Sequence, residues 1–152
     1  MYLIGQANDT HELVDMRDGV IVLGGYKFIT NYRVLSHSDG DVVLHTIANA
    51  ILGSVQMGDI GEHFSDTDKK NKWMSSIKII QFALKELFKK KYKIVNLDLT
   101  ITCENIILGS KKKQIQASLS KILKTKLINV KATRFEHPSN LIKCAAVILV
   151  NK

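Results

Sequence analysis

The sequence predicts an α/β fold in which helices cover one face of a mixed β-sheet. In several runs apolar and polar residues alternate, which is typical of half-buried strands. In other runs apolar residues recur every three or four positions, which is typical of amphipathic helices. The two kinds of segment follow one another along 152 residues. Because this is about the length of one domain, we expect a single domain over residues 1–152.

The chain is predicted to begin with strands. Residues 2–7 have the composition of a first strand, and residues 20–23 and 26–29 have that of a hairpin. Gly24 and Gly25 separate the two hairpin segments. A Gly-Gly pair supplies the positive φ angles that a tight primed turn requires, so we expect a two-residue turn here.

Two helices are predicted to follow. From Asp41 onward apolar residues fall at nearly 3.6-residue spacing, and either Asp39 or Asp41 can cap the first turn. Residues 75–90 repeat the pattern, with Ser75 or Ser76 as the cap. We therefore expect two helices in succession after the hairpin.

The second half of the chain returns to strands. Residues 93–102 alternate with a period of two and place one polar face opposite an apolar one. Residues 112–124 have helical spacing, and residues 129–133 and 144–150 have the composition of two further strands. Strands interrupted by helices in this order indicate a mixed sheet with a layer of helices.

The net charge of +8 raises the question of a nucleic-acid partner. The excess is almost all lysine, and residues 89–91 and 111–113 form two lysine runs near predicted helix ends. Lysines there suit the carbonyl end of a helix dipole or simply face water. No aromatic residues interleave these runs to stack on bases. We therefore expect no nucleic-acid partner, and the nucleic-acid alternative rests on net charge alone.

The sequence also bears on compartment. No apolar run reaches the roughly 18 residues that a membrane span needs, so no membrane partner is expected. The first residues lack the pattern of a secretory signal. Cys103 and Cys144 are far apart and outside any CxxC spacing, which favours buried thiols in a reducing compartment. We expect a cytoplasmic protein, or one of a plastid-type organelle if a leader has been removed.

Three residues have the chemistry of a metal site. Asp9 and His11 are two positions apart at a predicted strand end, so their side chains project to the same side. His45, one turn inside the first predicted helix, can supply a third ligand. Three protein ligands with one open position are typical of catalytic Zn²⁺. The alternative is that His45 is an ordinary packed or solvated side chain.

Further polar residues flank the same helix. His37 and Ser38 precede it, and Asn49 shares a helical face with His45. The helix leads into a glycine-containing loop, "MGDIGEHFSDTD", whose aspartates are Asp59, Asp66 and Asp68. As a group these aspartates suggest the polar floor of a cleft, although each one alone can be a cap or turn former.

Several stretches, taken in order, carry a family resemblance. They are "DTH", the "LGG" hairpin, "HSDGDVVLHTIANAILG", "MGDIGEHFSDTD", "LDLTI" and "NVKAT". Together they resemble the 2-C-methyl-D-erythritol 2,4-cyclodiphosphate synthases, enzymes of the non-mevalonate isoprenoid pathway. The resemblance covers nearly the whole chain.

The resemblance implies an assembly, a reaction and cofactors. It implies a homotrimer with active sites at subunit interfaces, each holding Zn²⁺ and a second divalent cation, Mg²⁺ or Mn²⁺. The family cyclises 4-diphosphocytidyl-2-C-methyl-D-erythritol 2-phosphate and releases CMP. The implied partner is therefore a small-molecule substrate linked to cytidine diphosphate.

The resemblance also implies roles for individual residues. Asp9, His11 and His45 correspond to the zinc ligands, and Glu136 corresponds to the acid that binds the second metal. His37 falls where the family has a histidine that stabilises the transition state. The positions implied to contact substrate are Asp9, His11, Ser38, Asp59, Gly61, Phe64, Asp66, Asp68, Cys103, Gly109, Thr133 and Glu136.

The sequence departs from the family pattern in two loops. In "KATRFEHPSNLIKCAAV", Arg134 and Phe135 replace threonines and the glycine-rich loop is missing or shortened. Arg134 takes the place of a catalytic threonine, where its guanidinium can bind phosphate through a bidentate fork or point to solvent. The cytidine loop, residues 103–109, also differs, and Asn49 and Ser75 stand where aspartates are common. These departures leave open an alternative function, a non-catalytic zinc-containing homologue that binds a nucleotide or isoprenoid diphosphate.

Overall fold

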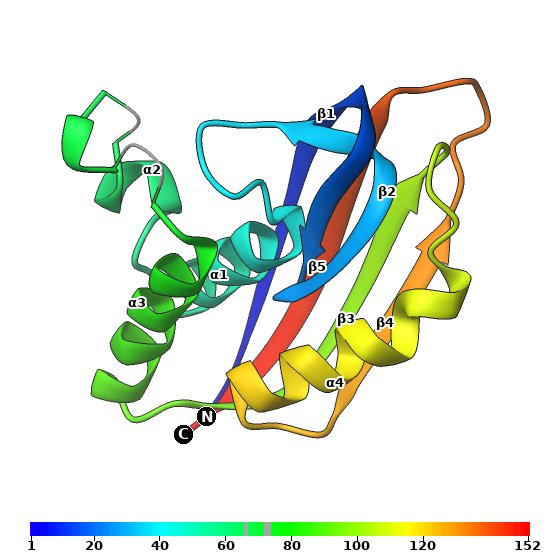
Figure 1. The fold of residues 1–152 in the computed structure, drawn as a ribbon. Helices are drawn as coiled ribbons and strands as arrows, with labels where there is room; N and C mark the ends of the chain where they lie inside the picture. The colour runs from blue at the N-terminus through cyan, green and yellow to red at the C-terminus, as the bar shows by residue number, and fades with distance from the viewer. Residues whose placement is uncertain (66, 72–73) are drawn as a thin grey trace.

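A computed structural model describes residues 1–65, 67–71 and 74–152 and shows a five-stranded mixed sheet (Figure 1). The strands are β1 (Tyr2–Leu23), β2 (Tyr26–Leu35), β3 (Lys93–Cys103), β4 (Ile128–Thr133) and β5 (Leu141–Asn151). They lie in the order β2-β1-β5-β3-β4. Strands β3 and β4 run parallel, and the other neighbouring pairs run antiparallel. The predicted mixed sheet is confirmed.

The helices lie on one face of this sheet (Figure 1). They are α1 (Val42–Ser54), α2 (Ile60–His63), α3 (Ser76–Lys89) and α4 (Lys112–Leu123), with short 3-10 turns at Lys69–Asn71 and Gly109–Lys111. Helix α1 packs on β1 and β5, α3 packs on α1, and α4 packs on β4. The core therefore sits between the sheet and the layer of α1, α3 and α4.

Helix α1 approaches the sheet very closely at Gly5. A Cβ atom placed on Gly5 would lie 1.8 Å from the carbonyl oxygen of Ala50, so no larger residue fits there without moving the helix. Along β3 the covered face carries Leu97, Leu99 and Ile101, all buried, as the period of two predicts. The close approach at Gly5 fixes where α1 stands above β1.

The first strand is much longer than predicted. The sequence predicts two separate strands over residues 2–7 and 20–23, but β1 runs without a break between them. Its first half pairs with β5 as far as Glu12, and its second half pairs with β2 from Glu12 onward. The pairing is irregular between Asp15 and Gly19. The prediction missed this because main-chain pairing continues through polar residues, and an uncovered sheet face demands no apolar pattern.

The predicted turn and the predicted first helix are held together by one buried carboxylate. Gly24 and Gly25 have φ angles of 59° and 78°, which confirms the turn. Asp41 is the N-cap of α1, where its side chain accepts hydrogen bonds from the backbone N–H groups of Val43 and Leu44. The same carboxylate accepts from the N–H groups of Gly24 and Gly25 at 2.9 and 2.8 Å. Asp41 thus ties the hairpin to the start of α1.

The two lysine runs occupy different kinds of helix end. Residues 89–91 lie at the C-terminus of α3, where cations suit the dipole. Residues 111–113 lie instead at the N-terminus of α4, so for this run only the solvent-facing explanation holds. Lys113 is exposed, and the ammonium of Lys111 lies 4.8 Å from the centre of the Phe28 ring.

Both cysteines are buried and free. Burial raises the pKa of the Cys144 thiol to about 12, and burial also raises the pKa of Cys103. Both thiols are therefore protonated and poorly nucleophilic at neutral pH, as expected of structural cysteines. Among the described residues, no helix combines the length and the apolar character that crossing a membrane requires.

Candidate active site

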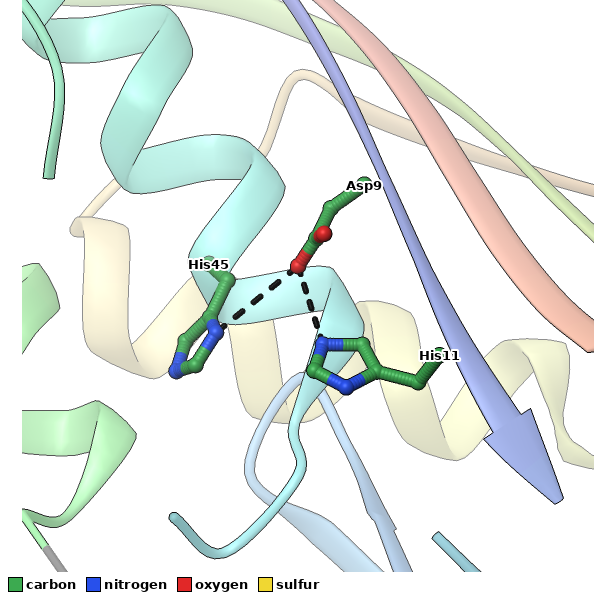
Figure 2. A group of neighbouring side chains, drawn as sticks. All are labelled: Asp9, His11 and His45. Carbon is green, nitrogen blue, oxygen red and sulfur yellow. Dashed lines mark hydrogen bonds and ion pairs between the residues drawn. The ribbon is translucent and has the colours of Figure 1, made fainter. Parts of the chain in front are cut away.

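The three predicted zinc ligands meet at one point (Figure 2). Asp9 and His11 project from the same side of β1, and His45 reaches them from the first turns of α1. The Oδ2 atom of Asp9 lies 3.0 Å from Nε2 of His11 and 3.7 Å from Nδ1 of His45. One ligand atom from each residue lies within 4.8 Å of the other two. The structure therefore assembles the predicted triad.

The donor set of this triad fits a zinc ion. One carboxylate oxygen and two imidazole nitrogens are ligands that Zn²⁺ prefers. In a tetrahedral site with bonds of about 2.0–2.2 Å, neighbouring ligand atoms are about 3.4 Å apart, and the two separations from Asp9 lie on either side of that value. The rings of His11 and His45 are tilted by 56°, so they approach the carboxylate from different directions. Three ligands arranged in this way leave one coordination position for substrate.

The environment favours the ionised form of Asp9. Partial burial by itself raises the pKa of the Asp9 carboxyl, but the hydrogen bonds from His11 and from the backbone N–H of Thr10 lower it. The net effect holds the pKa of Asp9 well below its usual range. A carboxylate that stays ionised is available as a metal ligand at neutral pH.

The triad opens into a cavity of about 710 Å³, a size typical of small-molecule sites. Four other predicted site residues line it, namely His37, Ser38, Gly61 and Phe64. Apolar side chains that sequence reasoning did not single out complete its wall: Leu35, Ile60, Met74 and Ile79. The cavity therefore combines a metal-ligating corner with an apolar wall.

Two aspartates after α1, Asp59 and Asp68, accept hydrogen bonds from nearby backbone N–H groups. Asp59 caps α2, and Asp68 accepts a hydrogen bond from a backbone N–H group in its own turn. Among the residues that the structure describes, neither lines the cavity, so the expectation of a shared polar floor is not met by these two. Asp66 lies outside the described residues. Asn49 lines the cavity instead, and its Oδ1 accepts from the N–H of Ile60 at 2.8 Å, which holds α2 beside the site.

The remaining predicted site residues gather elsewhere, near the ends of β3 and β4. They are Cys103, Gly109, Thr133, Arg134 and Glu136. Thr133 pairs with Thr102 in the parallel register of β3 and β4. The guanidinium of Arg134 is exposed and lies 4.0 Å from Glu104. Glu136 is exposed and joins no cluster of metal-ligating side chains within the described parts of the chain.

A comparison with family models covers nearly the whole chain. The model of the YgbB family matches residues 2–151. The chain belongs to the YgbB family. The match includes the loop around Arg134, where the sequence departs from the pattern expected of the cyclodiphosphate synthases.

Relatives and solved structures agree with membership in the YgbB family. The chain is 39% identical over 148 residues to the 2-C-methyl-D-erythritol 2,4-cyclodiphosphate synthase of Mycoplasmoides gallisepticum, covering 97% of this chain and 96% of the relative. It is 42% identical over 135 residues to the enzyme of that name from Clostridium perfringens, covering 88% and 85%. A solved structure of a protein of this name, in a CDP-bound form, superposes with a TM-score of 0.89 at 28% identity, covering 97% and 99%. The resemblance inferred from motifs is confirmed, and so is the fold.

The sequence did not identify Ser76 as a residue of the site in this YgbB family member. Ser76 appears in the sequence only as a candidate helix cap, and the structure gives the cap role to its neighbour Ser75. The hydroxyl of Ser76 instead lies 2.9 Å from Nε2 of His45. No local pattern could have indicated this contact, because the two residues are 31 positions apart and meet only when α3 packs on α1.

Proposed function

We propose that this YgbB family member is a 2-C-methyl-D-erythritol 2,4-cyclodiphosphate synthase. It converts 4-diphosphocytidyl-2-C-methyl-D-erythritol 2-phosphate to 2-C-methyl-D-erythritol 2,4-cyclodiphosphate and releases CMP. The observation that carries the proposal is the triad of Asp9, His11 and His45 opening into a cavity of about 710 Å³. The names of the two relatives, at 39% and 42% identity over most of the chain, support the same reaction.

The electrostatics of this reaction explain why the site is built around metal-ligating groups. A phosphate oxygen must approach the phosphorus of a diphosphate in the same molecule, so two anionic groups meet. Two like charges about 4 Å apart repel by about 4 kcal/mol at an effective dielectric constant of about 20. A zinc ion held by Asp9, His11 and His45 would supply positive charge that polarises phosphate oxygens. The chain's part is to hold the reacting groups in line and to donate hydrogen bonds to the charge that develops.

The positions of two neighbouring residues support this part of the proposal. His37 and Ser38 lie in the loop between β2 and α1 and line the same cavity as the triad. The hydroxyl of Ser38 accepts a hydrogen bond from the N–H of Gly40 and lies 3.1 Å from the hydroxyl of Ser36. These contacts fix the position of the Ser38 oxygen. We propose that His37 stabilises the transition state and that Ser38 binds the substrate.

We further propose that the protein is a homotrimer whose active sites lie at subunit interfaces. The sheet face opposite the helices carries exposed apolar side chains: Tyr2, Ile4 and Val147 are 65%, 70% and 48% exposed. Ile4 and Val147 alternate with residues that face the helices, so both point away from them. Apolar surface of this kind is typical of an interface between subunits. Light scattering is expected to give three times the 17.1 kDa chain mass, and a monomer would contradict the proposal.

A trimer also accounts for the two separate groups of site residues. In the register of the sheet, His11 pairs with Ile142, and Ile142 pairs with Cys103. The two groups therefore stand two strands apart, about 10 Å, within one chain. We propose that residues near Glu136 of one subunit complete the site around the triad of its neighbour. Arg134, Cys103, Gly109 and Thr133 would then contact the cytidine and phosphate end of the substrate.

Glu136 is proposed to bind the second divalent cation, Mg²⁺ or Mn²⁺. In the Glu136→Gln variant, we expect the Mg²⁺ concentration that gives half-maximal rate to rise by about tenfold or more, because the amide carries no charge. Zinc content, measured by elemental analysis, should remain that of the wild type. Glu86→Gln is the matched control, since Glu86 pairs with Lys89 on α3 away from both groups. Equal losses of zinc and of Mg²⁺ dependence would contradict separate sites.

The reaction itself is tested by CMP release. The zinc-loaded protein is incubated with Mg²⁺ and the diphosphocytidyl substrate, and CMP and the cyclic diphosphate are quantified together. We expect both products in equal amounts. Zinc-loaded protein without turnover would favour the alternative, a non-catalytic homologue that binds a nucleotide or isoprenoid diphosphate. That alternative is supported by Arg134 and the altered loop that follows it, which depart from the family pattern.

Two expectations about partners and compartment accompany the proposed enzyme. The net charge of +8 is the sole support for nucleic-acid binding, so we expect no RNA to copurify at moderate salt. The absorbance ratio at about 260 and 280 nm of the purified protein measures this. We place the enzyme in the cytoplasm, and the two buried free thiols are consistent with a reducing compartment.

A further inference from the structure

The second ring nitrogen of His45 is held by a residue from another helix. While Nδ1 of His45 faces Asp9, its Nε2 lies 2.9 Å from the hydroxyl oxygen of Ser76. Ser76 is the first residue of α3 and is fully buried. A single buried contact thus sets the orientation of a proposed zinc ligand from the side opposite the metal.

The hydroxyl of Ser76 is in turn bound by Asp39. One oxygen of the Asp39 carboxylate accepts from the Ser76 hydroxyl, and the other accepts from the Ser76 backbone N–H at 3.0 Å. The first oxygen also accepts from the N–H of Asp41 at 3.3 Å. Within the described parts of the chain, the hydrogen-bond partners of the Asp39 side chain are all donors, so the carboxylate acts as an acceptor.

This arrangement decides where the protons lie. A hydroxyl has one proton, and the hydrogen bond that Ser76 donates to the carboxylate of Asp39 places that proton between the two oxygens. The Ser76 oxygen therefore has only lone pairs to offer His45, so Nε2 of His45 must carry a proton and donate it. In a neutral imidazole the other nitrogen, Nδ1, is then unprotonated. Its lone pair points toward Asp9, where a metal would be held.

We propose that Asp39 and Ser76 are positioning residues that lock His45 in the tautomer able to bind zinc through Nδ1. The inference rests on the proposed zinc site and adds the residues that prepare it. The two distances from Asp9 agree with it. Nε2 of His11 lies 3.0 Å from Asp9, a hydrogen-bond distance, whereas Nδ1 of His45 stays at 3.7 Å. Two lone pairs facing each other repel, and a cation between them removes the repulsion.

The hydrogen-bond relay from Asp39 through Ser76 to His45 also couples the metal ligand to the surrounding loop. Asp39 follows His37 and Ser38 of the cavity wall and precedes Asp41, the cap of α1. Ser76 joins this loop to the N-terminus of α3. The relay therefore fixes the cavity wall and His45 relative to each other. Outer partners of metal ligands typically contribute about 10- to 100-fold to metal affinity.

Ser76→Ala tests the relay, and Ser75→Ala is its matched control. Ser75 is the adjacent serine and caps α3 by accepting from the N–H of Ile77, but it does not contact His45 in the structure. Both variants perturb the start of α3, and only Ser76→Ala removes the relay. We expect Ser76→Ala to weaken zinc binding by about 10- to 100-fold in competition with a chromogenic chelator. Ser75→Ala should bind zinc like the wild type while unfolding at a lower urea concentration, because it loses the cap of α3.

The tautomer gives a second readout that needs neither zinc nor activity. The chain has five histidines, so ¹⁵N-histidine labelling of the full-length, zinc-free protein gives a simple spectrum. The His45 signals are identified by their absence in His45→Gln. At about pH 8, where a model imidazole is neutral, we expect the wild type and Ser75→Ala to show a protonated Nε2 and an unprotonated Nδ1 at His45. Ser76→Ala should show a mixture of tautomers.

The zinc-affinity and tautomer measurements separate the relay from the proposed zinc site. A wild-type His45 protonated at Nδ1 would overturn the relay, and so would Ser76→Ala protein that binds zinc as tightly as the wild type. Equal loss of zinc affinity in Ser76→Ala and Ser75→Ala would also overturn it, because the cause would then be the helix end. If the wild type shows the expected tautomer but binds no zinc, the proposed metal function fails while the hydrogen-bond relay stands.

Discussion

His45→Ala protein is expected to purify without zinc and to form CMP at least about a thousandfold more slowly than the wild type. The substitution removes one of three ligands and leaves only Asp9 and His11, too few to hold zinc against dilution and chelators. A thousandfold loss corresponds to about 4 kcal/mol of transition-state stabilisation. That is about the repulsion between the two phosphate groups that the cation is expected to offset. The trimer should remain folded, because the His45 side chain is partly exposed and contributes little to the core.

Elemental analysis, the CMP assay and light scattering together check this expectation. His137→Ala is the control, since His137 is exposed in the loop between β4 and β5 and lies outside the triad. The control should retain wild-type zinc content. Full zinc occupancy in His45→Ala would show that His45 is not a ligand. Loss of the folded trimer would show that His45 is structural.

Asp41→Ala is expected to cause the largest loss of stability, at least about 4 kcal/mol in the free energy of unfolding. The Asp41 carboxylate is fully buried and accepts hydrogen bonds from four backbone N–H groups. Two of these groups belong to the Gly24-Gly25 turn and two to the first turn of α1. Each buried donor left without a partner costs about 1–3 kcal/mol. Since domains are typically stable by about 5–15 kcal/mol, the variant should lose much of its folded population.

Urea unfolding of zinc-free protein at matched concentrations measures this loss. Asp59→Ala is the matched control, because Asp59 also caps a helix but is exposed and accepts from a single backbone N–H. Its loss is expected to be about 1 kcal/mol or less. A similar small loss in Asp41→Ala would mean that the hairpin and α1 are held together by packing alone.

The features predicted correctly from sequence are those that depend on neighbours along the chain. The Gly24-Gly25 turn follows from the backbone freedom of glycine. A carboxylate cap at Asp39 or Asp41 follows from the helical pattern after them, and the structure places the cap at Asp41. The side-by-side projection of Asp9 and His11 follows from the period of a strand. Each of these signals lies within a few residues, so folding of the rest of the chain does not change it.

Two of the missed features depend on contacts between distant residues, and one depends on local hydrogen bonds. The sequence predicts separate strands over residues 2–7 and 20–23, with Asp9 and His11 at a strand end. Strand β1 is nevertheless continuous, because Asp9 pairs with Cys144 and later residues pair with β2. Asp59 and Asp68 have the composition of a cleft floor, but nearby backbone N–H groups occupy their carboxylates. The cavity wall instead comes from apolar residues whose positions are set by the packing of α1, α2 and α3.

The sequence by itself determined the alternation of strands and helices, the Gly24-Gly25 turn, the family and the three side chains proposed as metal ligands. Only the tertiary structure decided that His45 meets Asp9 and His11, because α1 must approach β1 closely enough for Ala50 to contact Gly5. It also decided which nitrogen of His45 is free, since Ser76 reaches that ring from α3. Side-chain chemistry and periodicity are local properties of the chain, whereas the direction of a ligand's lone pair depends on helices that pack together from distant positions.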